Sequence, residues 1–278
     1  AKCEPNEYKS EPGSAACLEC PGNASSPAGS TAKTDCRCNA GFAGNDGEEC
    51  TACGVNHYKT GLGNASCSEC PGNTSSPFAS TASTDCRCNA GFTGPNGGGC
   101  SLCGIGEYKT EPGNASCSEC PGNASSPTGS TAVTDCRCNP GFTGPDGGDC
   151  AACLVNEYKP APGDGVCSEC PGNSTSPVAS TAETDCRCVP GFTGNDGGPC
   201  VYCLSGTYKA TVGSAECTSC DQNEFSPNAS TSEAECVCDA EFERDEATGD
   251  CVACQPGTSK SGAGDYKCGA CPDNSFTS

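Results

Sequence analysis

Hydrophobic side chains are sparse along this chain, and its most regular apolar positions are cysteines. One or two apolar residues at a time are separated by loops rich in Pro, Gly, Ser, Thr and Asn, and no window shows helical periodicity. This pattern predicts short two-stranded β pieces and turns, with most residues irregular. The cysteines of one representative stretch are Cys53, Cys67, Cys70, Cys86, Cys88 and Cys100.

The same ladder of six cysteines recurs every fifty residues, which marks an internal repeat. Residues 51–100 and 101–150 are identical at about seven positions in ten. We expect one small module per period, including a fifth that holds one extra residue between Cys238 and Cys251. The resulting domains are 1–50, 51–100, 101–150, 151–200 and 201–251, followed by a partial sixth repeat at 252–278.

The two ends of the sequence interrupt the ladder. Adjacent repeats are joined by a C-x-x-C such as Cys50 to Cys53. Cys3 is the second cysteine of such a motif, and the first would fall just before Ala1. The sixth repeat breaks off at Ser278. We therefore expect the native polypeptide to extend in both directions, with a secretion signal outside this segment.

Composition explains why the cysteines must be cross-linked. The chain has 278 residues, of which 33 are cysteine, and only 34% are hydrophobic even with the cysteines counted. A fifty-residue unit so poor in Leu, Ile and Phe cannot offset its ordering entropy by burial alone. Disulfides supply the difference and persist in oxidising compartments. We expect a small disulfide-rich fold, a linear array of modules with short β-hairpins and little helix, in an extracellular protein that is secreted or on the cell surface.

The net charge of −21 limits the partners of this segment. An acidic surface repels nucleic-acid phosphates and anionic lipid headgroups, so neither is expected to bind. No apolar run approaches the length of a transmembrane helix, so no membrane insertion is predicted here.

The residues that could suggest catalysis or metal binding have simpler structural explanations. The repeated C-x-x-C could hold zinc or a redox dithiol, but the chain has a single histidine and its spacing favours disulfides. His57 stands where other repeats carry Glu or Thr, which indicates an exposed substitution. No Gly-rich phosphate loop is present. We predict no enzyme, no metal and no cofactor.

Aromatic residues also recur at fixed places in the repeats. Tyr58 and Phe92 have counterparts in each of the first four repeats. The large flat ring of such a residue, laid over a disulfide or at a module junction, would bury the most area available here. We interpret both as packing residues.

Two segments of each repeat resemble known families. The motif C-x-C-N-A-G-F-T-G, as at residues 86–94, looks like the carboxy half of an EGF-like domain. Residues 103–131, with C-x2-G-x-Y-K and C-x2-C-P-G-N, resemble the cysteine-rich ephrin-receptor-like family found in many protist and algal surface proteins. Tandem near-identical copies also resemble shaft proteins of flagellar hairs (mastigonemes). The resemblance implies an array of EGF-like modules; it does not identify one function, because such modules serve receptors, matrix proteins and filaments alike.

The EGF resemblance implies a disulfide pairing of first to third, second to fourth and fifth to sixth. The second repeat would then contain Cys53–Cys70, Cys67–Cys86 and Cys88–Cys100, and Cys268 would be left unpaired in this segment. Sequence alone does not choose among fifteen pairings. The main rival is sequential, with Cys53–Cys67, Cys70–Cys86 and Cys88–Cys100, and leaves Cys271 unpaired. Calcium is not implied, because the acidic signature of calcium-binding EGF domains is missing.

Glycosylation is the chemistry that the sequence supports. N-x-[ST] sequons recur at the same place in four repeats, directly after C-P-G, although Asn-x-Ser also simply makes good turns. We predict N-glycans pointing to solvent, and the resemblance to EGF-like domains also suggests O-linked sugar on the Thr of G-F-T-G. The N-linked positions are Asn23, Asn64, Asn73, Asn114, Asn123, Asn173 and Asn228, and the O-linked ones are Thr93, Thr143 and Thr193.

Two functions fit these features. The first is a structural extracellular glycoprotein that forms a stiff rod or filament shaft, of the cell-surface or flagellar-hair type, with sister chains or other filament proteins as partners. Stiffness follows because only two residues separate the cysteines at each junction. The alternative is the stalk or ligand-binding ectodomain of a cell-surface receptor, in which one repeat should stand out with its own aromatic or charged cluster. Single exposed candidates are Phe78 and Tyr202.

Overall fold

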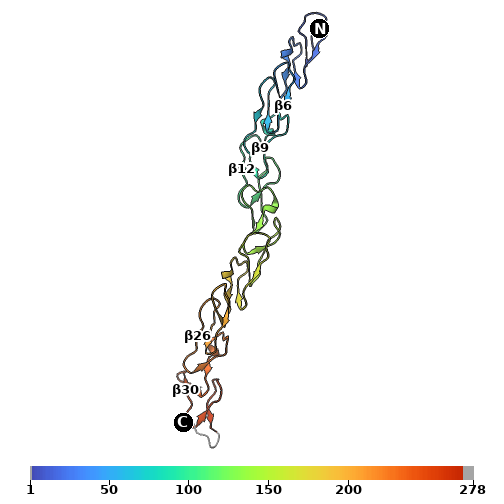
Figure 1. Cartoon of the computed structure of the whole chain (residues 1–278). Coiled ribbons are helices and arrows are strands. Elements are labelled where there is room, and N and C mark those ends of the chain that lie inside the picture. Colours follow the sequence, from blue (N-terminus) through green and yellow to red (C-terminus); the bar gives the residue numbers. More distant parts are fainter. Residues whose placement is uncertain (1, 272–278) are drawn as a thin grey trace. The chain divides into compact units, whose positions relative to one another are not determined.

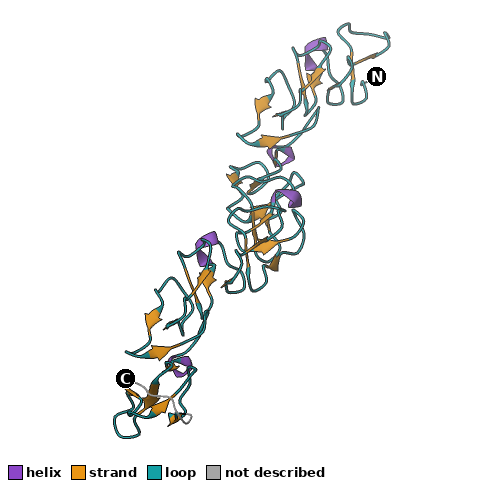
Figure 2. Ribbon diagram, turned by 60° about the horizontal axis from the view of Figure 1, so that its bottom comes forward, coloured by secondary structure: helices purple, strands orange, loops and turns teal. Residues whose placement is uncertain are grey.

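The computed structural model describes residues 2–271 of the chain. They form short antiparallel two-stranded sheets joined by loops and single 3-10 turns (Figures 1 and 2). Every strand is two or three residues long, because turn-forming residues interrupt the chain every few positions. The predicted fold class, a disulfide-rich array of repeats with short hairpins and little helix, is confirmed. None of the helices in the described part of the chain is long and apolar enough to span a membrane.

Each repeat uses the same hairpins in the same order. In the first, the strand that contains the Tyr, or Ser259 in the sixth repeat, pairs with the two residues between the cysteines of the C-x-x-C inside the repeat. These pairs are β1 (Glu7–Tyr8) with β2 (Leu18–Glu19), β7 (His57–Tyr58) with β8 (Ser68–Glu69), β13 (Glu107–Tyr108) with β14 (Ser118–Glu119), β19 (Glu157–Tyr158) with β20 (Ser168–Glu169), β25 (Thr207–Tyr208) with β26 (Thr218–Ser219) and β31 (Thr258–Ser259) with β32 (Gly269–Ala270).

The second hairpin joins the strand after C-P-G-N to the C-x-C strand, and a 3-10 turn lies between them. Its strands are β3 (Ala24–Ser25) with β4 (Arg37–Cys38), β9 (Thr74–Ser75) with β10 (Arg87–Cys88), β21 (Ser174–Thr175) with β22 (Arg187–Cys188) and β27 (Glu224–Phe225) with β28 (Val237–Cys238); β15 (Ala124–Ser125) and β16 (Arg137–Cys138) hold the same places in the third repeat. The turns are η1 (Lys33–Asp35), η2 (Ser83–Asp85), η3 (Val133–Asp135), η4 (Glu183–Asp185) and η5 (Glu233–Glu235).

The third hairpin links one repeat to the next. Phe42 pairs with Ala52, so the strands lie on either side of the boundary expected at residue 50. The fifty-residue period is therefore visible in the structure, while the exact boundaries stay a prediction. The pairs are β5 (Phe42–Ala43) with β6 (Thr51–Ala52), β11 (Phe92–Thr93) with β12 (Ser101–Leu102), β17 (Phe142–Thr143) with β18 (Ala151–Ala152), β23 (Phe192–Thr193) with β24 (Val201–Tyr202) and β29 (Phe242–Arg244) with β30 (Cys251–Ala253).

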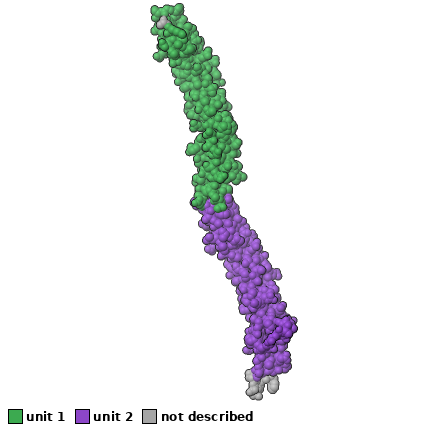
Figure 3. Space-filling view, turned by 180° about the vertical axis from the view of Figure 1, so that it is seen from behind, with its two compact units in different colours: residues 1–137, 146–149 green, residues 138–145, 150–278 purple. Residues whose placement is uncertain are grey.

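The chain divides into two compact units (Figure 3). The first comprises residues 1–137 and 146–149, and the second comprises residues 138–145 and 150–278. The border falls inside the third repeat, and the same hairpins recur in both units. Each unit is thus a series of copies of one module.

The core of the described residues is made of cysteines. Every buried hydrophobic side chain there is a cysteine, and the other buried side chains are serines, lysines and one threonine, Thr74. The aromatic residues expected to pack, such as Tyr58 and Phe92, are half-buried rather than buried. Cross-links and hydrogen bonds therefore take the place of an aliphatic core.

Sixteen disulfides join the described cysteines in sequential order. The second repeat contains Cys53–Cys67, Cys70–Cys86 and Cys88–Cys100. The EGF-like pairing, with Cys53–Cys70 and Cys67–Cys86, is wrong; the bond Cys88–Cys100, common to both schemes, is confirmed. In the folded chain the Cα atoms of Cys53 and Cys67 lie 5.7 Å apart, within the range that a disulfide spans.

The sequential pairing also changes which cysteine of the sixth repeat has no disulfide partner. Cys254 is bonded to Cys268, so the expectation of a free Cys268 is wrong. Cys271 is the free cysteine among the described residues.

Candidate functional site

The repeated sequon after C-P-G lies on the surface. Asn23, Asn73, Asn123 and Asn173 are all exposed, as a glycan acceptor must be. Each also has a positive φ, between 60° and 62°, at the third position of a tight turn. Asn tolerates this left-handed conformation better than most residues. The asparagine therefore has a backbone role that is independent of any sugar.

The fifth repeat separates these two roles. Asn223 stands at the equivalent position but is followed by Glu224-Phe225, so it is not a sequon. It nevertheless keeps φ at 64°, and its Nδ2 donates to Cys251 O at 3.3 Å, as Asn23 Nδ2 donates to Cys50 O at 3.4 Å. The turn thus retains Asn where the sequon is lost, and N-glycosylation of the other four stays a prediction.

The remaining sequons are also accessible. Asn64, Asn114 and Asn228 are exposed. Asn228 Oδ1 accepts a hydrogen bond from the Ser205 backbone N–H at 2.8 Å, which leaves its Nδ2 for a glycan. Exposure is necessary for modification, and these three positions also stay predictions.

The threonines of G-F-T-G take part in contacts between repeats. The hydroxyls of Thr93, Thr143 and Thr193 donate to Ala115 O, Gly165 O and Ala215 O of the following repeat, at 2.9–3.1 Å. O-glycosylation would replace the hydroxyl proton and remove this donor. Sugar on these threonines remains a prediction, but the structure gives them a structural role that the sequence did not suggest.

A buried lysine forms the centre of each junction, and sequence reasoning missed it. Lys109 is only 5% exposed, and its Nζ donates to Phe92 O of the preceding repeat at 2.7 Å and to Gly113 O of its own at 2.6 Å. Backbone carbonyls thus replace water around the ammonium group. The signal was available, because a lysine follows the Tyr, or Ser259, at the same place in every repeat: Lys9, Lys59, Lys109, Lys159, Lys209 and Lys260.

Burial has a measurable effect on these lysines. It lowers the pKa of Lys59, Lys109 and Lys209, and the negative charge of Asp46 and Asp196 partly offsets this for Lys59 and Lys209. Lys9 occupies the same place in the first repeat, where this sequence holds no repeat before it, and it is only half-buried. Burial of the lysine therefore depends on the preceding repeat.

Backbone contacts complete the junction. Gly91 N–H donates to Lys109 O at 2.9 Å, and Cys103 N–H donates back to Gly91 O at 2.9 Å. Gly91 has φ +77°, and a Cβ there would lie 2.4 Å from Gly129 O. At Gly91 both the backbone conformation and the close approach of Gly129 O therefore favour glycine. The other junctions repeat the first bond with Gly41, Gly141, Gly191 and Glu241 as donors.

Hydrogen bonds from Ser and Asp hold the second loop of each repeat. In the first, buried Ser26 donates to Glu7 O at 3.0 Å and Ser30 to Pro27 O at 2.8 Å. Asp35 Oδ2 accepts from the backbone N–H groups of Thr31 and Ala32, both at 2.9 Å. The bonds from Ala32 and Thr31 hold the pKa of Asp35 below its ordinary value. The Ser- and Pro-rich segment is therefore an ordered part of the module.

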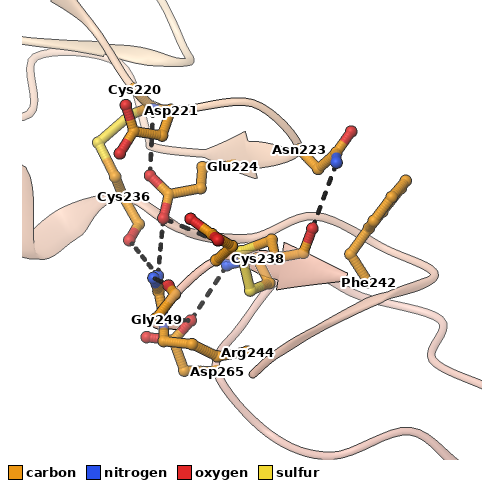
Figure 4. A network of polar contacts seen from close by, with 12 residues as sticks. Cys220, Asp221, Asn223, Glu224, Cys236, Cys238, Phe242, Arg244, Gly249 and Asp265 are labelled. Atoms are coloured by element: carbon orange, nitrogen blue, oxygen red, sulfur yellow. Dashed lines mark hydrogen bonds and ion pairs between the residues drawn. A yellow bond between two sulfur atoms is a disulfide. The ribbon is translucent and has the colours of Figure 1, made fainter. Parts of the chain in front are cut away.

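The fifth repeat carries a charged cluster that the other repeats lack. Arg244 replaces the second glycine of G-F-T-G, and its Nη2 lies 2.9 Å from Glu224 Oε1 while its Nε lies 3.0 Å from Asp265 Oδ1 of the sixth repeat. Its guanidinium also donates to Cys236 O at 3.1 Å and Gly249 O at 2.7 Å (Figure 4). The carboxylates raise the pKa of Arg244, Asp265 first. Burial would raise the pKa of Asp265, but bonds from Cys238 N–H and Arg244 lower it overall.

This cluster compensates for a changed loop. In the first four repeats a glycine N–H, such as that of Gly47, donates to the carbonyl of the fourth cysteine, Cys36 O, at 2.7 Å. In the fifth repeat Arg244 donates to the equivalent Cys236 O. Glu243 accepts from Cys268 N–H at 2.8 Å. Charged side chains thus tie the fifth repeat to the sixth.

The described residues include two groups whose atoms could approach a metal ion. They are Cys3, Glu7 and Cys17, and Cys220, Glu224 and Cys236. In both, the two sulfurs form a disulfide with each other, so neither can act as a thiolate ligand. One carboxylate remains, which is too few ligands for a structural metal.

His57 has the contacts of a surface residue. Its side chain is 38% exposed, its Nδ1 lies 3.0 Å from Val55 O, and its Nε2 lies 3.8 Å from Glu69 Oε1. The structure thus places a backbone carbonyl and one exposed carboxylate beside this ring.

Comparison with known proteins identifies the repeat. A search of the curated proteins found no match. A family described as tyrosine-protein kinase ephrin type A/B receptor-like matches four segments, residues 41–86, 91–136, 141–186 and 191–236. Each segment runs from the junction glycine to the fourth cysteine of the next repeat, and together they cover about two thirds of the chain. The chain therefore belongs to the family of ephrin type A/B receptor-like cysteine-rich repeats.

Proposed function

We propose that this chain is a structural extracellular glycoprotein whose repeats stack into a stiff rod or filament shaft. The observation that carries the proposal is the junction: five times along the described chain a buried lysine accepts a backbone hydrogen bond from the preceding repeat. In four of these junctions its ammonium group also donates to carbonyls of that repeat. Linkers without fixed contacts would let modules reorient, whereas this arrangement ties each repeat to its neighbour. Sixteen disulfides support an oxidising, extracellular setting.

The surface supports the same function. Seven exposed sequons, together with a net charge of −21, would give a hydrated coat that discourages sideways aggregation. Sister chains or other filament proteins are the proposed partners, and a flagellar-hair or other cell-surface shaft is the proposed setting. Conversion of Asn23, Asn73, Asn123 and Asn173 to Asp by peptide-N-glycosidase treatment of the native protein would establish the coat.

Small-angle X-ray scattering of the intact chain tests the rod. A compact domain of 278 residues has a radius of gyration of about 19 Å, and a fully unfolded chain about 58 Å. A rod should instead show the intensity decay of a cylinder with a constant, narrow cross-section. A distance distribution that fits only a flexible string of beads would contradict the proposal.

A receptor ectodomain is the second candidate, and the fifth repeat favours it. That repeat has the Arg244 cluster and carries Val237 where the earlier repeats carry Arg. The family description also refers to receptors. Electron microscopy of native material distinguishes the two, because a shaft protein should appear in fibres and a receptor stalk at single membrane sites.

A further inference from the structure

A pocket recurs at the same place in the first, second and fourth repeats. In the second repeat it has a volume of about 410 Å³ and is lined by Ser75, Ser76, Pro77, Asp85, Arg87 and Pro112. The equivalent pockets of the first and fourth repeats have volumes of about 540 and 380 Å³. We call these three the Asp–Arg pockets. Each lies within one compact unit.

The junction builds each Asp–Arg pocket. Five of the six lining residues of the second repeat come from its second hairpin and η2, whereas Pro112 comes from the first loop of the next repeat. Leu62 and Val212 take the place of Pro112 in the other two pockets. The contacts around the buried lysines therefore also fix the shape of the pockets.

The polar groups of the pocket have capacity left for a ligand. Asp85 Oδ2 accepts from Thr81 N–H and Ala82 N–H, both at 2.9 Å, which fixes the position of the carboxylate. The guanidinium of Arg87 makes no hydrogen bond or ion pair with the described residues. The guanidinium of Arg187 lies 3.8 Å from Asp196 Oδ2, and the Arg187 side chain is 59% exposed. A guanidinium carries five N–H donors, so most of them are available.

Charge restricts what could bind. Each pocket holds one carboxylate and one guanidinium, so an anionic ligand would meet Asp85 and a cationic ligand would meet Arg87. The net charge of −21 further repels polyanions. A neutral ligand that both donates and accepts hydrogen bonds satisfies both groups.

The apolar wall adds a second requirement. Leu62 and Val212 are 61% and 50% exposed, although they line the pocket, and Pro77 is exposed as well. An uncovered aliphatic surface beside donors and acceptors suits the C–H face and the hydroxyl edge of a sugar ring. Two such sites in adjacent repeats of the first unit suit a repeating polymer, because weak single contacts then add up as avidity.

We propose that the Asp–Arg pockets bind neutral saccharide units, of a polysaccharide or of the glycans on another copy of this chain. The inference does not depend on the rod, since a receptor ectodomain could use the same sites.

Titration of the intact chain with neutral hexasaccharides tests the proposal. The probes are hexamers of β-1,4-linked glucose, N-acetylglucosamine and mannose, and NMR of the arginine Nε–H groups is the readout. At least one probe should shift the signals of Arg37, Arg87 and Arg187 with millimolar dissociation constants, about −4 kcal/mol per site. An oligogalacturonate of the same length should not. Absence of shifts with all three neutral probes at about 20 mM, or an equal response to the anionic one, would overturn the proposal.

Variants show whether the pockets are responsible. The triple variant Arg37→Gln, Arg87→Gln and Arg187→Gln should lower affinity at least tenfold for a polymer of the active sugar. A control with the same change in net charge is Ser68→Glu, Ser118→Glu and Ser168→Glu, on exposed strands that do not line the pockets. Equal losses in both variants would refute a role for the pockets. Enzymatic removal of the N-glycans from the chain separates the two sugar sources: self-association lost on deglycosylation indicates glycans of a second copy, whereas unchanged binding of added polysaccharide indicates an external one.

Discussion

At the scale of single residues, the junction is built from side chains that usually stay hydrated. Lys59, Lys109, Lys159, Lys209 and Lys260 are each at most 5% exposed. Lys260 Nζ donates to Cys238 O, Phe242 O and Gly264 O, and it also lies 4.7 Å from the ring centroid of Tyr266. An ammonium group has three donors, so carbonyls at the junction can satisfy it almost fully. The result is a polar core at the place where an aliphatic one is missing.

Gly91→Ala should weaken the junction between the second and third repeats. The new Cβ would meet Gly129 O at 2.4 Å, and alanine at φ +77° is strained. We expect a loss of about 1–3 kcal/mol in local stability. Amide hydrogen exchange at Gly91 and Cys103 measures it, and should accelerate about tenfold for each 1.4 kcal/mol. Gly72→Ala is the control, because nothing lies within 4 Å of its Cβ and its φ is not positive; equal effects of the two changes would contradict the argument.

Acid should loosen the η1 turn through Asp35. Its pKa in the folded chain is lowered from 3.8 by hydrogen bonds from Ala32 and Thr31. A carboxyl with a lowered folded pKa stabilises the fold above its unfolded pKa, and this stabilisation is lost as the pH falls through the folded value. The amide protons of Thr31 and Ala32 should therefore titrate with a midpoint below 3.8. Asp35→Asn should abolish that titration, and a midpoint at or above 3.8 in the parent chain would count against it.

At the scale of elements, the sequence specified the hairpins better than the cross-links between them. The loops rich in turn residues predicted short two-stranded β pieces without assigning their residues, and the structure contains them, for example at Glu107–Tyr108 and Phe92–Thr93. The disulfide partner of Cys67 could not be chosen in this way, because six cysteines allow fifteen connectivities and the sequence does not show which cysteines the fold brings together. The EGF resemblance favoured Cys70 as the partner of Cys53, but in the folded chain Cys53 is bonded to Cys67.

The candidate sites show the same division. Recurrence and turn chemistry located the exposed asparagines, such as Asn73. The buried position of Lys109 and the pocket around Arg87 could not be foreseen, because both require the next or preceding repeat to be placed against the hairpin. Repetition within one module is visible in the sequence, whereas contacts between modules are a property of the fold.

Arg244→Ala should loosen the link between the fifth and sixth repeats. The Glu224 side chain, 9% exposed, would lose its partner, and Cys236 O would lose its donor. Because Arg244 itself is 31% exposed, we expect about 1–3 kcal/mol rather than the larger value for a fully buried pair. Hydrogen exchange at Cys238 N–H, which donates to Asp265, reports the change.

The control for this change is a second ion pair in the same region. Lys267 and Glu246 lie 3.2 Å apart but are 60% and 85% exposed. Lys267→Ala should change local stability by less than about 0.5 kcal/mol. If Lys267→Ala lowered local stability as much as Arg244→Ala does, the loss of a positive charge in general, and not the loss of the buried cluster, would explain both results.

At the scale of the whole molecule, disulfides hold each repeat and polar contacts hold the repeats together. Each bond of the first four repeats closes a segment in which the two cysteines are 12, 14 or 16 positions apart, as in Cys88–Cys100, Cys53–Cys67 and Cys70–Cys86. A loop of about 15 residues contributes roughly 3 kcal/mol by restricting the unfolded chain. The junction lysines and glycines then connect each repeat to the next.

Reduction should therefore collapse every repeat, whereas heating with the bonds intact should not. The buried hydrophobic side chains of the described chain are all cysteines, so little apolar burial remains once they are thiols exposed to water. We expect the dispersed amide signals of the oxidised chain to merge into those of an unfolded chain on reduction, and to persist on heating without reductant. Alkylation before digestion gives the control, since peptides linked through Cys53 and Cys67 should be recovered only from the unreduced sample. A reduced chain that kept dispersed signals and a single sharp melting transition would show that packing, rather than cross-linking, maintains the fold.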